Sequence, residues 1–275
     1  MKEKSSEKFA PKKSLGQNFL TSAVVPTWMC DAANLLPSDT VLEIGPGTGK
    51  LTDILLKRGV RVVAVEADLR AVTYLKQAFK TELETGQLQL FHGDIKDLTP
   101  AILDLKSGEY VAVANIPYYL SGYLLRLLLS GVAQPKTLVF LMQKELVERI
   151  ARAKKESLLS LSVKAFGQPH YIKTVTRGHF LPQPKVDSAI LAVRDVSTHN
   201  FRSLAPDFFF DLLHLGLGKK RKQLMTNLCE RYQREEVTAV FSRLGFLLTV
   251  RGEDLALAEW LELAKALTTM EKNLK

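Results

Sequence analysis

Short apolar runs alternate with stretches of helical apolar spacing along the chain up to about Val196. The short runs hold four to seven residues and end in glycine or a polar side chain, which is typical of buried strands. Alternation of such runs with helices predicts an α/β fold built on a mostly parallel sheet. We expect seven strands, near residues 41–45, 61–65, 88–92, 110–114, 137–142, 171–176 and 187–193.

The remainder of the chain follows a different pattern. From about Phe201 the apolar residues recur at a spacing near 3.6, in the segments 208–217, 235–246 and 256–267, and this spacing predicts helices. The polar run 195–200 lies between the two patterns and is interpreted as a linker. The 275 residues, of which 46% are hydrophobic, suffice for two cores. We therefore expect two domains, residues 1–196 and 197–275.

The first apolar run leads directly into the sequence G-P-G-T-G, which contains Gly45, Gly47 and Gly49. Missing side chains let the backbone turn tightly and approach a ligand closely. The second run ends at Glu66, about 20 residues later, where such folds hold a ribose because a carboxylate accepts hydrogen bonds from both vicinal hydroxyls. This pattern predicts a nucleotide-type cofactor that lies across the strand ends.

The spacing of the glycines disfavours two common cofactors, NAD and ATP. The dinucleotide fingerprint needs a third glycine five positions after the first, and that position is Lys50. A phosphate-binding P-loop needs Ser or Thr after Gly-Lys and another glycine five positions before that Gly, but Leu51 and Ile44 stand there. The glycines alone are also compatible with a tight turn that binds nothing.

Two further apolar runs end in polar residues, at Asp94 and Asn115. A carboxylate such as Asp94 suits the exocyclic amino group of an adenine. Each residue taken alone is compatible with a helix cap or a turn. Because the carboxyl ends of parallel strands form the ligand crevice of open α/β sheets, polar residues at successive ends favour one binding site.

These residues carry a resemblance to a known family. G-P-G-T-G, Glu66, Asp94 and the Asn-Ile-Pro-Tyr sequence that begins at Asn115 resemble class I S-adenosylmethionine-dependent methyltransferases that act on an amino nitrogen. The segments 13–20, KSLGQNFL, and 180–189, FLPQPKVDSA, are similar to parts of the KsgA-type ribosomal RNA adenine dimethyltransferases. The likeness extends from about Pro11 to the C-terminus.

The resemblance implies a fold and an activity. The fold would be a Rossmann-like seven-stranded class I methyltransferase sheet, with the last two strands as an antiparallel edge pair, followed by a small all-helical C-terminal domain that binds RNA. The cofactor would be S-adenosyl-L-methionine. The substrate would be N6 of two adjacent adenosines in the hairpin loop near the 3′ end of small-subunit ribosomal RNA, within the immature 30S subunit.

Further site residues are implied by the resemblance. Asn18 and Leu20 would lie over the methionine end of the cofactor. Asn115 would bind the cofactor together with Gly45, Glu66 and Asp94, which the strand pattern already indicates. Phe180 would cover one face of the target base, although a lone Phe before Leu-Pro is equally compatible with core packing. The resemblance also places a basic helix at the densest run of positive charge, where we expect phosphate contacts from Lys219, Lys220, Arg221 and Lys222.

The chemistry of the Asn-Ile-Pro-Tyr sequence follows from the substrate. The lone pair of an adenine amino nitrogen is delocalised into the ring, so an enzyme must expose and align it. The side-chain carbonyl of Asn115 and the backbone carbonyl of Ile116 can accept hydrogen bonds from the amino group. Pro117 restricts Ile116 to extended geometry. Tyr118 would stack on the base, a contact worth ~1–3 kcal/mol.

The overall charge fits a polyanionic partner. Lys and Arg number 38 against 29 Asp and Glu, which gives a formal net charge of +9. The basic residues between Arg149 and Lys155 are more compatible with a solvated helix face than with RNA contacts. We expect no metal, because the five histidines have no cysteine partners at ligand spacing.

The remaining features concern location and assembly. Two cysteines, Cys30 and Cys229, are too few for a disulfide framework and favour a reducing compartment. The N-terminus has no apolar core typical of a signal peptide, and no apolar run is long enough to span a bilayer. We expect a cytoplasmic monomer that does not contact membranes.

Two rival interpretations stay open. KsgA-type enzymes more often have Leu at the position of Ile116, whereas Ile is frequent in the relatives that methylate large-subunit RNA and confer antibiotic resistance. The sequences GQNFL, VDSA and KKRKQL favour the small-subunit enzymes. Alternatively, the protein acts mainly as a binding factor in ribosome assembly and methylation is secondary. The complete site makes binding alone insufficient as an explanation.

Overall fold

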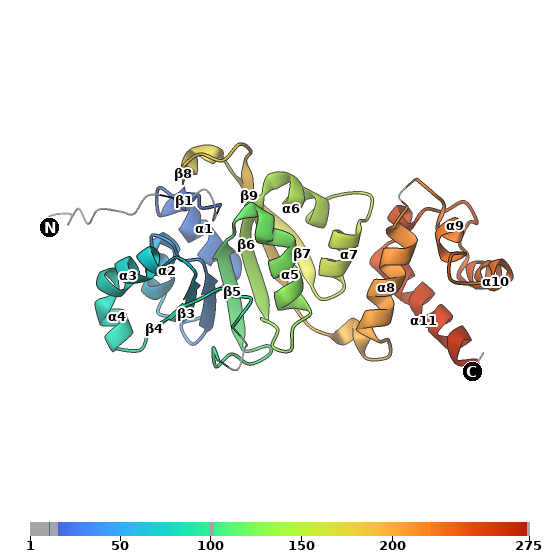
Figure 1. The fold of residues 1–275 in the computed structure, drawn as a ribbon, viewed down its shortest axis with the longest axis horizontal. Coiled ribbons are helices and arrows are strands. Elements are labelled where there is room, and N and C mark those ends of the chain that lie inside the picture. The colour runs from blue at the N-terminus through green and yellow to red at the C-terminus, as the bar shows by residue number, and fades with distance from the viewer. Residues whose placement is uncertain (1–10, 12–15, 99–101, 220, 274–275) are drawn as a thin grey trace. The chain divides into compact units, whose positions relative to one another are not determined.

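The computed structural model describes residues 11, 16–98, 102–219 and 221–273, and its ribbon is drawn in Figure 1. Its residues fall into two compact units. The first unit reaches Val147 and resumes with Gln168–Val196, and the second comprises Glu148–Gly167 and Ser197 onwards. The predicted boundary after Val196 coincides with one limit of these units, and residues 148–167 join the helical unit.

The first unit is an α/β unit around a sheet of seven strands, as the apolar pattern predicts. The strand order is β4-β3-β2-β5-β6-β9-β7. Neighbours from β4 to β6 run parallel, whereas β9 runs antiparallel to both β6 and β7. The bounds are β2 Thr40–Ile44, β3 Arg61–Glu66, β4 Leu88–His92, β5 Tyr110–Asn115, β6 Thr137–Gln143, β7 Gln168–Val175 and β9 Ser188–Arg194.

All seven predicted strands are confirmed, with ends that differ from the sequence expectation by up to three residues. The last two strands do pair antiparallel, with β7 at the edge and β9 inside the sheet. A two-residue pair is added, β1 Phe19–Leu20 with β8 Phe180–Leu181, which joins segments far apart in the sequence (Figure 1). Neither strand has enough residues for a periodicity that the sequence could reveal.

Helices alternate with these strands. In chain order they are α1 Val24–Ala33, α2 Lys50–Lys57, α3 Leu69–Ala78, α4 Lys80–Glu84, the 3₁₀ turn η2 Tyr118–Leu120, α5 Ser121–Leu129 and α6 Lys144–Ala151. The 3₁₀ turn η3 Arg177–His179 precedes β8. Within the described residues, every helix is either too short or too polar to cross a lipid bilayer.

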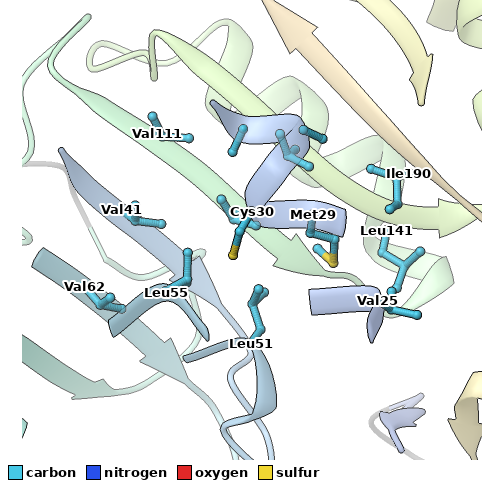
Figure 2. Close-up of a cluster of buried hydrophobic side chains, with 14 of the residues drawn as sticks. Val25, Met29, Cys30, Val41, Leu51, Leu55, Val62, Val111, Leu141 and Ile190 are labelled. Atoms are coloured by element: carbon cyan, nitrogen blue, oxygen red, sulfur yellow. The ribbon is translucent and has the colours of Figure 1, made fainter. Parts of the chain in front are cut away.

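One face of the sheet is covered by α1 and α2, as Figure 2 shows. Successive side chains of a strand point to opposite faces, so alternate residues of neighbouring strands form one apolar layer. On this face the layer includes Val41, Val62, Val111, Leu141 and Ile190, and the helices contribute Val25, Met29, Cys30, Leu51 and Leu55. This packing fixes the sheet from which the strand ends project.

The second unit is all-helical, which confirms the expected helical C-terminal region. Its helices are α7 Leu158–Lys164, α8 Pro206–Leu217, α9 Leu224–Leu228, α10 Arg234–Leu244 and α11 Leu257–Asn273, with 3₁₀ turns η4 His199–Phe201 and η5 Gly252–Asp254. Leu161 and Ala165 lie in the same buried cluster as Trp260. Residues 148–167 therefore join this unit because the apolar face of α7 belongs to its core.

Trp260 is the largest fully buried side chain of the helical unit. Its indole Nε1 donates to the carbonyl of Gly252 at 3.1 Å. Gly216 on α8 lies against the ring so closely that a Cβ there would stand 2.4 Å from Cη2 of Trp260. The same Cβ would stand 2.8 Å from Leu224. Glycine is required at this position by space.

Gly216→Ala is therefore expected to lower the free energy of unfolding of the helical unit by ~1–2 kcal/mol. Overpacking costs ~1–3 kcal/mol, and alanine recovers up to ~1 kcal/mol in a helix interior. Urea denaturation followed by Trp260 fluorescence in a Trp28→Phe background measures this unit. The control is Ser242→Ala at an exposed position of α10. A Gly216→Ala midpoint as high as that of the control would contradict the packing argument.

Candidate active site

A cavity in the α/β unit opens at the carboxyl ends of the parallel strands, where β2 lies between β3 and β5. Ligands of open α/β sheets bind at this reversal of strand order. The cavity is lined by these sequence-predicted residues: Asn18, Gly45, Glu66, Asp94, Asn115, Ile116, Tyr118 and Phe180. The structure thus brings together residues that lie up to 162 positions apart in the chain.

The glycine loop after β2 has backbone conformations that favour glycine. Gly45, Gly47 and Gly49 have φ of 69°, 56° and 73°, all in the left-handed region. A Cβ at Gly49 would stand 2.5 Å from the ring of Phe79, whereas a Cβ at Gly45 would meet nothing within 4 Å. The loop therefore packs tightly at Gly49 and leaves space at Gly45, which lines the cavity.

Glu66 at the end of β3 is 5% exposed and ties this loop to its own strand. Its Oε2 accepts a hydrogen bond from the amide of Gly47 at 2.9 Å, and Oε1 accepts one from the amide of Asp68 at 2.8 Å. Burial raises the pKa of the Glu66 carboxyl, and the amides of Asp68 and Gly47 oppose that shift. Each carboxylate oxygen has a second lone pair, which suits a pair of ribose hydroxyls.

Asn115 at the end of β5 is bonded to the N-terminal segment. Its Nδ2 donates to the backbone carbonyl of Asn18 at 3.0 Å, which identifies Oδ1 as the acceptor end of the amide. Ile116 is 3% exposed, and its amide donates to the carbonyl of Leu141 at 3.2 Å. The backbone that carries the Ile116 carbonyl is thus fixed by β6.

Tyr118 is half-buried, and its hydroxyl shares a hydrogen bond of 2.9 Å with Oγ of Ser188. Ser188 is fully buried at the start of β9, within the VDSA sequence. Burial raises the pKa of the Tyr118 phenol, and the bond to Ser188 opposes that shift. This bond fixes the ring of Tyr118 at the cavity and gives VDSA a structural role that the sequence did not reveal.

Two predicted residues line the cavity and also make a structural contact, and a third makes only a structural contact. Asp94 lines it, and its Oδ1 also accepts from the amide of Lys96 at 3.0 Å, the turn contact expected of aspartate. Phe180 lines it and belongs to the core cluster. Leu20, by contrast, packs into that core, and its neighbour Phe19 lines the cavity.

The sequence did not single out Glu43 on β2, which is fully buried. Its Oε2 accepts from the hydroxyl of Thr52 on α2 at 2.8 Å, and Oε1 has no partner within the described residues. Burial raises the pKa of this carboxyl to about 8. An acidic residue inside an otherwise apolar strand was the signal that could have identified it.

Of the predicted basic run, Lys219, Arg221 and Lys222 lie in the second unit between the end of α8 and the start of α9, so the expectation of a helix is wrong at these residues. Lys219 forms an ion pair with Glu230, and Arg221 and Lys222 are exposed. Lys220 lies outside the described residues. The expected helix over Arg149–Lys155 is wrong beyond Ala151, where α6 ends, and Lys155 forms ion pairs with Glu253 and Asp254. No cluster of three or more His, Cys, Asp or Glu side chains suited to a metal occurs in the described part of the chain.

The fold and the site define a Rossmann-like α/β enzyme of the class I methyltransferase type. The profile of the ribosomal RNA adenine dimethylase family matches residues 8–269. A ribosomal RNA small subunit methyltransferase A of Dehalococcoides mccartyi is 37% identical over 252 residues, which cover 90% of this chain and 86% of its own. The protein of that name from Thermosynechococcus vestitus is 36% identical, with coverage of 95% and 98%.

Solved structures agree with these relatives. A dimethyladenosine transferase from Plasmodium falciparum has a TM-score of 0.78 at 27% identity, covering 93% of this chain and 98% of its own. The 23S ribosomal RNA methyltransferase ErmE has a TM-score of 0.72 at 22% identity, which concerns the fold alone. The chain belongs to the ribosomal RNA adenine dimethylase family and is a methyltransferase.

Glu43 is expected to make the stability of the α/β unit depend on pH. Between its ordinary value of 4.5 and about 8, the unfolded chain has lost this proton while the folded chain keeps it. The free energy of unfolding therefore falls as pH rises through this window, by up to ~1.4 kcal/mol per pH unit. Glu43→Gln should remove this part of the slope between about pH 5 and pH 8.

Urea denaturation at several pH values measures this slope. The matched control is Glu109→Gln, at an exposed glutamate, which should retain the wild-type pH dependence. Equal slopes for Glu43→Gln and wild type would show that the buried carboxyl does not hold its proton.

Proposed function

We propose that this protein transfers methyl groups from S-adenosyl-L-methionine to N6 of two adjacent adenosines in the hairpin loop near the 3′ end of 16S ribosomal RNA, giving N6,N6-dimethyladenosines. The substrate would be the RNA within an immature small subunit. The observation that carries the proposal is the single cavity that is lined both by Glu66 at the end of β3 and by Asn115, Ile116 and Tyr118 at and after the end of β5. The small-subunit relatives, at 30–37% identity, support this RNA over large-subunit RNA.

The described residues fit the proposed cofactor. The open space at Gly45 admits a ligand against the backbone, and Glu66 presents lone pairs for ribose hydroxyls. Asp94 and Asn18 line the same cavity, and the Asp94 carboxylate would accept a hydrogen bond from the adenine amino group of the cofactor. When bound, S-adenosyl-L-methionine supplies an electrophilic methyl group, so the protein need not activate it.

The protein's own groups align the nucleophile. Oδ1 of Asn115 and the carbonyl of Ile116 would accept hydrogen bonds from the target amino group and turn its lone pair towards the methyl group. Both acceptors are held by bonds to other segments, to Asn18 and Leu141. Such pre-organised geometry can replace a bimolecular encounter, a gain of several orders of magnitude. The proton released from nitrogen leaves to water.

The base itself would be held by aromatic contact. Tyr118 is fixed through Ser188, so its ring is ordered before RNA binds, and Phe180 lines the same cavity. An ordered ring loses little conformational entropy on binding. The two rings would enclose an adenine that has left its stack, which costs less for a loop nucleotide than for a duplex one.

We also propose that the helical unit binds RNA. The exposed Arg221 and Lys222, with Lys219 beside them, provide positive charge for phosphates, and the net charge of +9 favours such a partner. Since Lys219 is already paired with Glu230, RNA would have to compete for it. The protein would act as a monomer in the cytoplasm, where small subunits mature.

Labelled S-adenosyl-L-methionine tests the substrate assignment. Incubation with immature small subunits should place two methyl groups on each of the two adjacent adenosines, as mapped by mass spectrometry of RNA digests. Large-subunit RNA in the same assay is the control. Label in large-subunit RNA alone would assign the other substrate, and no label in either despite cofactor binding would leave a binding factor.

The roles of Glu66 and Asn115 are expected to separate. Glu66→Ala should weaken S-adenosyl-L-methionine binding about 10- to 150-fold, because hydrogen bonds to a charged group contribute ~1.5–3 kcal/mol. Asn115→Ala should mainly lower kcat, by a factor of roughly 10²–10³, the loss typical of one pre-organised polar contact. Calorimetry and steady-state kinetics measure the two effects. Equal loss of cofactor affinity in both variants would overturn this division.

A further inference from the structure

Two of the described Phe, Trp and Tyr side chains are exposed, and the others are buried or partly buried. One of the two lines the cavity, and the other directly precedes Leu124, which also lines it. Among the large hydrophobic residues that are exposed, the aromatic ones are Tyr119, 65% exposed, and Tyr123, 38% exposed. They stand four residues apart, on η2 and the first turn of α5. A single exposed ring is common on protein surfaces, whereas two exposed rings within one turn of each other beside a cavity are available to contact a ligand.

Tyr119 follows Tyr118 directly but has a different environment. The Tyr118 hydroxyl is bonded to Ser188, whereas Tyr119 lies on the cavity wall and presents most of its surface to solvent. The ring is supported from one side, because a Cβ at Gly16 would stand 3.1 Å from its Cε1. Gly16, with φ of 60°, thus lets the N-terminal segment pack against Tyr119. The result is a supported, exposed ring.

Tyr123 is accompanied by a positive charge. Nζ of Lys96 lies 5.3 Å from the centre of the Tyr123 ring, within the range of a cation–π contact. Lys96 is exposed and stands two residues after Asp94, whose carboxylate holds the Lys96 amide. The cation is therefore attached to the loop that forms the cavity wall. Aromatic rings with a nearby cation are the combination that binds single-stranded nucleic acid.

We propose that Tyr119, Tyr123 and Lys96 form a platform for the nucleotide that adjoins the target adenosine. Its base would stack on the tyrosine rings, and its phosphate would lie near Lys96. The inference rests on the proposed function, because it needs one base of a single-stranded loop inside the cavity. Adjacent nucleotides are covalently linked, so a base that passes Tyr118 leaves its neighbour at the cavity mouth, where Tyr119 stands.

The platform would explain how the protein holds two adjacent target adenosines at once. With one adenosine in the cavity, the base beside it would be the second target, held outside while the first reacts. Stacking tolerates any base, so the platform would bind and position this nucleotide and would not read its identity. A protein partner fits the surface less well, because Lys96 and two phenolic hydroxyls leave no continuous apolar area.

The first test compares variants on a short RNA hairpin that carries the two adenosines. Tyr119→Ala and Tyr123→Ala should each weaken hairpin binding about 5- to 100-fold, the range measured for loss of one stacking contact. Tyr119→Phe and Tyr123→Phe keep the ring and should stay within about twofold of wild type. Tyr171→Ala, on β7 and outside the cavity wall, is the matched control. Calorimetric affinity for S-adenosyl-L-methionine should be unchanged in every variant.

The second test identifies the contact by a double-mutant cycle. A hairpin that lacks only the base next to the target should bind wild type more weakly, by a factor similar to that of Tyr119→Ala. The same hairpin should bind Tyr119→Ala no more weakly than the intact hairpin does. The proposal is wrong if the loss of affinity from Tyr119→Ala and the loss from removing the neighbouring base simply add, whichever of the two nucleotides beside the target lacks its base. It is also wrong if both alanine variants bind the intact hairpin as tightly as wild type does. A defect seen only with whole subunits would instead assign the surface to a protein partner.

The outcome is separable from failure of the proposed function. If wild type methylates no adenosine in the hairpin or the subunit, the proposed function fails. If wild type methylates the hairpin and the alanine variants bind and methylate it equally well, the platform alone fails.

Discussion

The buried carboxylate of Glu66 is the interaction on which the site depends. By accepting from the amides of Gly47 and Asp68, it connects the glycine loop after β2 to the turn after β3. These bonds offset the cost of burying a charge, and they orient the group that would meet the ribose. Because β2 and β3 are parallel and in register, their ends stay adjacent, and the bond has a fixed geometry.

The part of the cavity lining that follows β5 depends on contacts between distant segments. Asn115 is bonded to Asn18, and Tyr118 is bonded to Ser188. Each bond holds a residue of the Asn-Ile-Pro-Tyr sequence by a group from an otherwise separate motif. The separate sequence motifs GQNFL and VDSA therefore hold polar side chains of the cavity in place before a ligand binds.

The strands and most cavity residues could be predicted because their signals are local. An apolar run that ends in glycine or a polar residue indicates both a strand and its end, and parallel pairing brings such ends together. Contacts such as Glu43 with Thr52 leave no periodic trace and could not be predicted. Side-chain direction was also beyond the sequence: in the pair Phe19–Leu20, the first residue faces the cavity and the second the core.

The domain boundaries and the role of the charged residues could also be predicted only in part. The polar linker near Val196 indicated one boundary, but α7 joins the helical unit through Leu161, an apolar contact that spacing alone cannot assign. The count of basic residues indicated an anionic partner without showing which cations are already paired. Lys219 and Lys155 both have acidic neighbours in the structure.

The short pair β1–β8 joins an early and a late segment of the chain beside the cavity. Phe19 near the start of the chain pairs with Leu181, so the ribosome makes the two strands of this pair far apart in time. A nascent chain that has exposed only β2 to β6 lacks both this pair and Ser188. Apart from Phe180, the described residues that line the cavity precede β6 in the chain, so the Phe180 ring and the bond from Ser188 to Tyr118 are the last parts of the cavity to be made.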